Sequence, residues 1–193
     1  MVATTTTTRM TLAEYLATEA DSPEKREFVN GEIIAMSGVS TAHALVQANL
    51  TATLVGHLRG GPCRVLTSDH RVRIDETGMY AYPDLSVFCG KPRTSTERPP
   101  SLLNPTVVFE VLSESSERYD RGAKATHYRR RESLQAYVLV ASQEKRVEVF
   151  ARNPDSSWTL TEATGEGTVR LTPLGVDLPL AEVYAGVDDL PAA

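Results

Sequence analysis

One acidic residue inside a continuous apolar run is the feature that most constrains this chain. Residues 107–112 read Val-Val-Phe-Glu-Val-Leu, so Glu110 stands among residues typical of a strand buried on both faces. A carboxylate buried among apolar side chains is costly unless it is paired, protonated or bound to a metal ion. The alternative is an outward position on an edge strand. Glu110 therefore indicates either a polar site or the edge of a sheet.

A second acid stands near the start of an earlier apolar run. Residues 81–89 read Ala-Tyr-Pro-Asp-Leu-Ser-Val-Phe-Cys, with Asp84 as the acid. If the two strands lie side by side, Asp84 and Glu110 meet and can hold Mg²⁺ or Mn²⁺, which take carboxylate and carbonyl oxygens plus water. The alternative for Asp84 is a turn or cap residue after a proline.

Length and composition predict an ordinary globular domain. The 193 residues are enough for one buried core, and we expect a disordered tail over residues 1–10, a single domain over 11–187 and a C-terminal tail over 188–193. No apolar run is long enough to cross a bilayer, so no membrane partner is expected. The net charge of −5 argues against bulk attraction to nucleic acid. A nucleic-acid role would need a local basic patch.

The cysteines and the N-terminus favour a cytoplasmic protein. Cys63 and Cys89 are the two cysteines, and their spacing fits no metal site. We predict two small, buried, separate thiols in a reducing compartment. The first residues contain no apolar signal core, which argues against secretion.

The pattern of elements predicts an α/β or α+β fold in which helices flank a central mixed sheet. Asn30-Gly31 predicts a tight hairpin, and apolar residues every fourth position predict a helix over about 41–59. The remaining expectations are a short helix from residue 11, strands at 64–67, 71–74, 136–141 and 146–150, an exposed loop at 91–104, a helix at about 119–132, an antiparallel extension at 158–160 and 169–171, and a helical turn at 180–184.

Three further residues are candidates for the same site. Lys124, on the helix after the Glu110 strand, could fold back to stabilise developing negative charge or orient a water. Its alternative is a surface i,i+4 pair with Asp120. Glu27 could be an extra metal ligand or a surface residue of the hairpin. His43, on the buried stripe of the helix at 41–59, could be a proton donor or base, or a hydrogen-bonded core histidine.

The helix around Lys124 is basic in an otherwise acidic chain. This surface could contact phosphates, or it could be a solvated helix balanced by neighbouring glutamates. Both interpretations stay open. The arginines are Arg118, Arg121, Arg129, Arg130 and Arg131, and the balancing acids are Glu114, Glu117 and Glu132.

These motifs occur in an order that resembles the Uma-type restriction endonucleases, a branch of the PD-(D/E)XK nuclease superfamily. The resemblance covers roughly residues 12–150. The matching residues are Tyr82-Pro-Asp84, Phe109-Glu-Val-Leu-Ser113, the series Asp120, Lys124 and Tyr128, the strand at 135–140, the upstream segment 26–32, and the isolated His43.

The resemblance implies a restriction-endonuclease-like core, a metal-dependent phosphodiesterase site and often a homodimer. On this basis Pro83-Asp84 is the first acidic element and Glu110 the second acid. The position two residues after Glu110 is Leu112, where the superfamily usually has lysine. In this family the lysine stands on the following helix, which gives the role to Lys124.

Two functions follow. The first is a Mg²⁺-dependent endonuclease that hydrolyses phosphodiester bonds of nucleic acid, with DNA preferred to RNA as the expected partner. The second is a catalytically inactive protein of the same fold that binds nucleic acid or protein as an accessory factor. The acidic net charge and Leu112 favour the second function, and the intact pair of acids favours the first.

Overall fold

Two six-stranded sheets and a two-stranded sheet make up the β-structure. The computed structural model describes residues 8–36 and 38–191. In the first sheet the order is β1-β3-β2-β6-β5-β8, and in the second it is β12-β11-β10-β9-β7-β4. The first comprises β1 (Thr8–Arg9), β2 (Arg26–Val29), β3 (Glu32–Ala35), β5 (Arg71–Ile74), β6 (Met79–Ala81) and β8 (Ser101–Leu102). The second comprises β4 (Cys63–Thr67), β7 (Leu85–Cys89), β9 (Val107–Leu112), β10 (Ala136–Ala141), β11 (Arg146–Arg152) and β12 (Trp158–Thr164). The two-stranded sheet pairs β13 (Thr168–Leu171) with β14 (Val176–Pro179).

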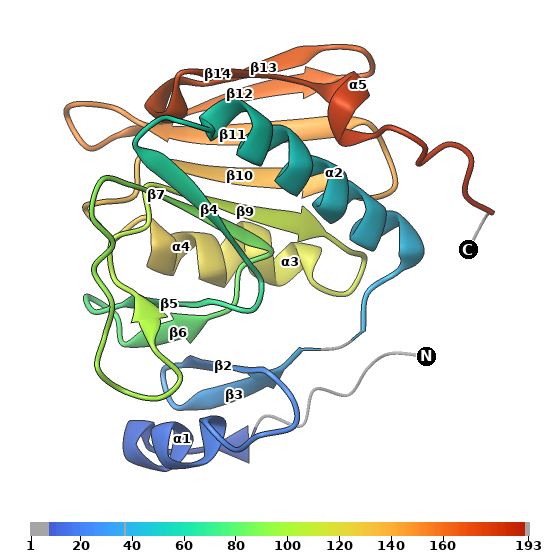
Figure 1. Cartoon of the computed structure of the whole chain (residues 1–193). Helices are drawn as coiled ribbons and strands as arrows, with labels where there is room; N and C mark the ends of the chain where they lie inside the picture. Colours follow the sequence, from blue (N-terminus) through green and yellow to red (C-terminus); the bar gives the residue numbers. More distant parts are fainter. Residues whose placement is uncertain (1–7, 37, 192–193) are drawn as a thin grey trace.

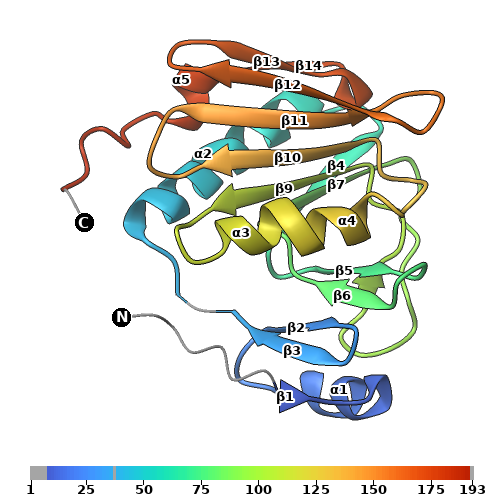
Figure 2. The ribbon, with the colours of Figure 1, turned by 180° about the vertical axis from the view of Figure 1, so that it is seen from behind.

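Helices cover both faces of the second sheet. Helix α2 crosses one face, together with α5 near its upper edge, and the segment from α3 to α4 lies on the other (Figures 1 and 2). Helix α1 packs beside β2 and β3 at the far end (Figure 1). The helical elements are α1 (Leu12–Glu19), α2 (Thr41–Leu58), α3 (Glu117–Tyr119), the π-helical turn η1 (Asp120–Lys124), α4 (Ala125–Tyr128), the 3-10 turn η2 (Thr172–Leu174) and α5 (Leu180–Val183). The predicted class, a mixed sheet flanked by helices, is confirmed.

Strand β9 lies in the middle of the second sheet and separates two apolar cores. It is antiparallel to β7 and parallel to β10, and the segment α3–η1–α4 forms the crossover between the parallel strands. Val107, Phe109 and Val111 belong to the core on the α2 side, whereas Val108 and Leu112 belong to the core beneath the crossover. Because side chains alternate along a strand, Glu110 faces the crossover.

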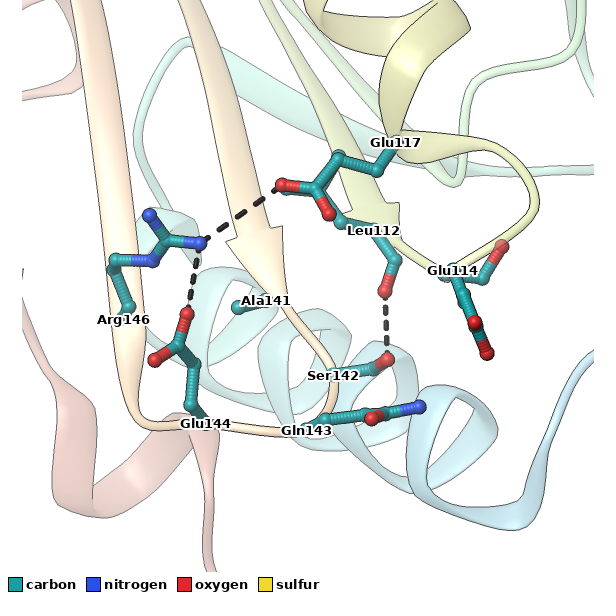
Figure 3. Close-up of a pocket in the computed structure, with 9 residues that line it drawn as sticks. Leu112, Glu114, Glu117, Ala141, Ser142, Gln143, Glu144 and Arg146 are labelled. Carbon is teal, nitrogen blue, oxygen red and sulfur yellow. Dashed lines mark hydrogen bonds and ion pairs between the residues drawn. The ribbon is translucent and has the colours of Figure 1, made fainter.

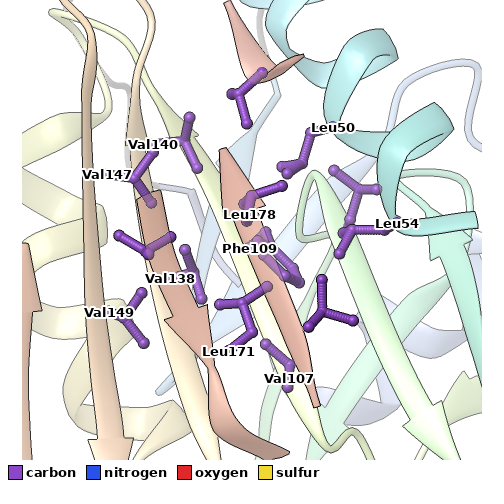
Figure 4. Packing of buried hydrophobic residues seen from close by; sticks show 14 of the residues in the cluster. Leu50, Leu54, Val107, Phe109, Val138, Val140, Val147, Val149, Leu171 and Leu178 are labelled. Atoms are coloured by element: carbon purple, nitrogen blue, oxygen red, sulfur yellow. The ribbon is translucent and has the colours of Figure 1, made fainter. Parts of the chain in front are cut away.

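The larger core lies between α2 and the second sheet. Figure 4 shows Leu50 and Leu54 of α2 facing Val107 and Phe109 of β9, with Leu178 of β14 near them. These side chains are fully buried. The predicted stripe on α2, Val46, Leu50, Leu54 and Leu58, is therefore confirmed as core.

Local sequence signals account for the elements that frame the site. Asn30 and Gly31 both adopt positive φ, 52° and 85°, as a tight turn between β2 and β3 requires. Ser40 caps α2, because its hydroxyl accepts from the backbone N–H of His43 at 3.2 Å. The hairpin turn and the N-cap therefore position strand β2, which carries Glu27, and the start of α2, which carries His43.

The cysteine prediction is wrong. Cys63 on β4 and Cys89 on β7 are paired across the two strands and form a disulfide. The sequence separation of 26 residues gave no local signal, because the two residues meet only once β4 and β7 pair. The cytoplasmic expectation loses the support that free thiols gave it.

Several predicted boundaries also differ from the structure. Thr8–Arg9 form β1 beside β3, ahead of the predicted domain start at residue 11. Residues 1–7 of the predicted N-terminal tail and residues 192–193 of the predicted C-terminal tail lie outside the described residues. The loop at 91–104 contains β8, where Leu102 is fully buried. The helix expected at 119–132 begins at Glu117, contains a π turn and ends at Tyr128.

The predicted antiparallel extension is correct for one of its two strands. β12 extends the second sheet by pairing with β11, whereas β13 pairs with β14, a strand that the sequence pattern did not indicate. Among the residues that the structure describes, no helix is both long and apolar enough to cross a membrane.

Candidate functional site

The predicted site residues converge where the chain passes from the first sheet to the second. Glu27 comes from β2, and Asp84 lies in the link between β6 and β7. Glu110 lies on β9, and Lys124 ends the π turn η1. His43 lies in the first turn of α2. Both six-stranded sheets, and the helices on both faces of the second sheet, therefore contribute residues to one site.

Lys124 joins three carboxylates. Its Nζ lies 2.9 Å from Glu27 Oε1, 2.9 Å from Glu110 Oε1 and 3.6 Å from Asp120 Oδ1. Each of these four side chains is at most 5% exposed. The lysine is thus turned inward from the crossover and neutralises part of a buried acidic cluster, and the surface ion pair considered as its alternative is excluded.

Glu110 occupies a central strand, so its alternative as an outward residue of an edge strand is also excluded. Burial raises the pKa of Glu110 well above its usual value; Lys124 opposes this, and the negative charges of Asp120 and Asp84 add to it. Its Oε1 contacts the ammonium of Lys124 but receives no hydrogen bond of good geometry. One oxygen of this acid therefore has unused capacity as an acceptor.

The other members of the cluster show the same excess of negative charge. Burial alone would lower the pKa of Lys124, but the attraction of Glu110 and Glu27 outweighs it and raises that pKa well above the usual value. Burial raises the pKa of Asp120, against the opposing effect of Lys124. The ammonium therefore keeps its proton, while burial and the repulsion between the acids favour the protonated forms of Glu110 and Asp120.

Asp84 is held by three neighbours. His43 Nε2 lies 3.0 Å from Asp84 Oδ1, and the backbone N–H of Val111 donates to Asp84 Oδ2 at 2.7 Å. The Gln47 side chain donates to the Asp84 carbonyl at 3.0 Å. Since Leu85 pairs with Phe109, Asp84 lies opposite Glu110 across the two strands, as the prediction of neighbouring acids requires.

Glu27 links the lysine to the backbone beside Asp84. The N–H of Tyr82 donates to Glu27 Oε1 at 3.0 Å, and the same oxygen contacts Lys124. Glu27 is buried, so a surface position on the hairpin is excluded. Its contacts orient both the lysine and the link that carries Asp84.

Asp120 is the residue that sequence reasoning missed. Sequence reasoning included it in the matching series and as a possible surface partner of Lys124, but not as a site residue. In the structure it is buried, and its carbonyl accepts from the Tyr137 hydroxyl at 3.0 Å. The signal was present in the spacing of Asp120, Lys124 and Tyr128, which predicts a shared helix face. The sequence did not show that this face is turned inward.

Ion pairs occupy part of the basic helix. Arg121 pairs with Glu117 at 2.6 Å and with Glu148 at 2.5 Å, and Arg131 pairs with Asp75 and Glu76. Arg118 and Arg130 are exposed. The interpretation as a helix balanced by neighbouring glutamates therefore holds for Arg121 with Glu117, whereas Arg131 is buried and pairs with acids of another segment. The exposed arginines stay candidates for phosphate contact.

A pocket of about 360 Å³ opens at the C-terminal ends of β9 and β10 (Figure 3). Ser142 closes part of it by donating to the Leu112 carbonyl at 2.6 Å, and Arg146 pairs there with Glu144 at 2.7 Å. Three glutamates and a single arginine line it, and the five predicted site residues are not among its lining. The pocket has the wrong charge for a phosphate and is separate from the acidic cluster.

The carboxylates of Asp84 and Glu110 are of the kind that binds hard divalent cations. Asp84 and Glu110 supply carboxylate oxygens from paired strands, and Glu110 has an oxygen without a hydrogen-bond donor. Among the described residues, however, no group of three or more His, Cys, Asp and Glu side chains is placed to hold a metal ion. Two acids, completed by water, are therefore the part of the chain that fits such an ion.

Comparison with known proteins places the chain in a family. A family model described as "Uma2: Putative restriction endonuclease" matches residues 12–181. The chain belongs to the Uma2 family. The PD-(D/E)XK nucleases, of which Uma2 is a branch, generally use divalent metals.

Similar proteins extend over nearly the whole chain. Two proteins of Synechocystis sp. are similar in sequence: uncharacterized protein slr1290 is 34% identical over 90% of this chain and 90% of its own, and uncharacterized protein sll1609 is 36% identical over 86% and 94%. A crystal structure titled as a putative nuclease belonging to DUF820, from Anabaena variabilis, superposes with a TM-score of 0.70 at 17% identity, covering 89% of this chain and 98% of that one. At that identity the match shows the fold alone, and the predicted nuclease-type fold is confirmed.

Proposed function

We propose that this Uma2 protein is a metal-dependent endonuclease that hydrolyses phosphodiester bonds of nucleic acid, with DNA as the preferred substrate and Mg²⁺ or Mn²⁺ as cofactor. The observation that carries the proposal is the approach of Lys124 Nζ to Glu110 Oε1, 2.9 Å, beside Asp84. A binding protein would have little reason to bury several acids around one lysine, because an excess of buried charge is costly.

Asp84 and Glu110 would hold the metal ion in this proposal. When bound, such an ion makes water more acidic and neutralises charge on a phosphoryl oxygen. The remaining steps belong to the chain's own residues. Lys124 stabilises the negative charge that develops on the phosphoryl oxygens as water adds to phosphorus and the P–O ester bond breaks. The products are a phosphate monoester end and a hydroxyl end.

His43 and Glu27 act in the proposal mainly through their neighbours. His43 Nε2 contacts Asp84 Oδ1 at 3.0 Å and so orients that carboxylate. Glu27 holds both Lys124 and the Tyr82 amide, which favours a role in placing the lysine. The expectation that Glu27 is a third metal ligand remains a prediction, as does a proton-transfer role for His43.

The test is cleavage of single-stranded, duplex and branched DNA and of RNA, with Mg²⁺ or Mn²⁺. Asp84→Ala and Glu110→Ala are expected to abolish cleavage and Mn²⁺ binding measured by calorimetry. Asp177→Ala is the matched control, because that acid is exposed and pairs with Arg170 on β13, away from the acidic cluster. Cleavage that survives loss of both site acids would refute the assignment.

A second candidate is a nuclease-fold protein that binds nucleic acid or protein without cutting. It is favoured by a specific observation: both oxygens of Asp84 already have partners, and the described residues include no group of three or more metal-binding side chains. It predicts nucleic-acid binding without Mn²⁺ binding and without cleavage. The two measurements together separate the candidates.

For its setting we propose a cytoplasmic homodimer. The family resemblance supports the dimer. The Cys63–Cys89 disulfide argues against the cytoplasmic location. Sedimentation equilibrium tests the dimer, and a mass of one chain at micromolar concentration would contradict it.

A further inference from the structure

The crossover that carries Lys124 contains a turn of π-helix between two short α-helical pieces. A π turn, whose hydrogen bonds join residues five apart, is rare. It occurs mostly as a single turn within an α-helix, and frequently at functional sites. Here it spans Asp120–Lys124, so its first residue and its last residue are the two members of the acidic cluster that the crossover supplies. The shape of this turn therefore decides where the ammonium lies.

Tyr137 ties the start of the turn to the sheet. It lies on β10, is fully buried, and its hydroxyl donates to the carbonyl of Asp120 at 3.0 Å. On β10, Tyr137 is paired with Val108 and Leu139 with Glu110. Tyr137 thus stands one strand from Glu110, on the same face of the sheet, and links the crossover backbone to the strand pair that carries the acid.

Tyr128 provides an internal comparison. It lies on α4, is also fully buried, and its ring centroid is 5.3 Å from that of Tyr137. Its hydroxyl has no hydrogen-bond partner within the described part of the chain. The two rings therefore share one packed core, and they differ in whether the hydroxyl contacts the crossover backbone.

We propose that Tyr137 is a positioning residue for Lys124: its hydroxyl holds the π turn at Asp120 and thereby fixes the ammonium between Glu27 and Glu110. The placement of Lys124 is a structural claim, and only its effect on cleavage rests on the proposed function. The Tyr137 hydroxyl donates to a backbone carbonyl, so its proposed effect on Lys124 is transmitted through the backbone of the turn.

The experiment compares Tyr137→Phe with Tyr128→Phe, each of which removes one buried hydroxyl and keeps the ring. In protein labelled with ¹⁵N-lysine, the ammonium of Lys124 is expected to give a slowly exchanging signal, identified by its loss in Lys124→Met. We expect this signal in wild type and in Tyr128→Phe, and its loss or a clear shift in Tyr137→Phe. For cleavage we expect Tyr137→Phe to lower kcat roughly tenfold or more with KM unchanged.

The outcomes are distinguishable. An unchanged Lys124 signal in Tyr137→Phe, or equal effects of the two substitutions, overturns the proposal. If wild type cleaves nothing, the proposed function fails, and the lysine spectra still decide this inference. If Tyr137→Phe does not fold, exchange of the Tyr137 hydroxyl proton in wild type decides: slow exchange with water supports the hydrogen bond, and fast exchange overturns it.

Discussion

Replacing Lys124 by methionine gives the sharpest test of the acidic cluster. Methionine keeps the length and apolar stem of the side chain but removes the charge, so packing is largely preserved. Glu27, Glu110 and Asp120 then remain buried without the cation that contacts all three. The substitution therefore isolates the electrostatic contribution of the lysine.

The expected magnitude follows from burial. Removing one partner of a buried ion pair costs about 3–5 kcal/mol, because the charge left behind is neither solvated nor paired. All four side chains are at most 5% exposed, so solvent screening does not reduce this figure. With a urea dependence of roughly 2 kcal/mol per molar, the unfolding midpoint should fall by about 2 M.

The loss should depend on pH. With Lys124 gone, the cluster acids lose the neighbour that favours their ionised form, so their pKa values rise further. At acid pH these groups are protonated in both the folded and the unfolded state, and the variant should approach wild type. The destabilisation should grow as the pH rises through the ordinary carboxyl range toward neutral.

Urea unfolding at several pH values measures this, with Lys145→Met as the control. Lys145 also contacts two acids, Glu166 at 3.2 Å and Asp188 at 3.0 Å, but those acids are more than 70% exposed. Surface pairs of this kind contribute little, so the control should unfold close to wild type at every pH. Equal losses in the two variants, or a loss at Lys124 that does not change with pH, would refute the buried-cluster argument.

Three further predictions concern the same framework. Glu110→Gln should gain stability relative to wild type as the pH rises above 4.5. Because the folded-state pKa of Glu110 is raised, the native wild-type protein retains a proton that the unfolded chain releases, and this costs the wild type stability. A difference in unfolding free energy that is constant with pH would contradict this. Gly31→Ala should lower the free energy of unfolding by about 1–2 kcal/mol, because Gly31 has φ 85°. Gly56→Ala, at an open position in α2, should be neutral or stabilising by up to about 1 kcal/mol. Thermal or urea unfolding measures both, and equal effects would contradict the role of Gly31 in the turn. Reduction of the Cys63–Cys89 disulfide should lower the free energy of unfolding by about 3.5 kcal/mol for a separation of 26 residues. Mass analysis after alkylation without reductant should find no modified cysteine. Two alkylated thiols would show that the bond is absent.

Signals carried by neighbouring residues predicted much of the fold. The Asn30-Gly31 hairpin, the buried stripe of α2 and the strand with Glu110 at its centre were all read correctly, because each depends on φ preference or on side-chain periodicity within one element. The single acid in an apolar run left a polar site and an outward position on an edge strand as the two alternatives before any contact was known. Periodicity shows which residues face inward.

The sequence pattern was least informative where distant segments meet. The Cys63–Cys89 bond, the burial of Leu102 in β8 and the pairing of β13 with β14 all arise from contacts between segments whose local sequence does not specify a partner. The π turn was likewise unexpected, since the spacing of Asp120 and Lys124 is equally typical of a regular surface helix.

The sequence alone determined that Glu110 needed either a buried partner or an outward position on an edge strand, and the family resemblance named Lys124 as the lysine of the site. Only the tertiary structure decided that Glu27, Glu110 and Asp120 share this lysine, with Asp84 opposite Glu110 and held by His43. The physical reason is that these residues lie on β2, β9, the crossover, the link before β7 and α2. Strand order and the direction of the crossover bring them together, and neither is encoded by the periodicity of any one element.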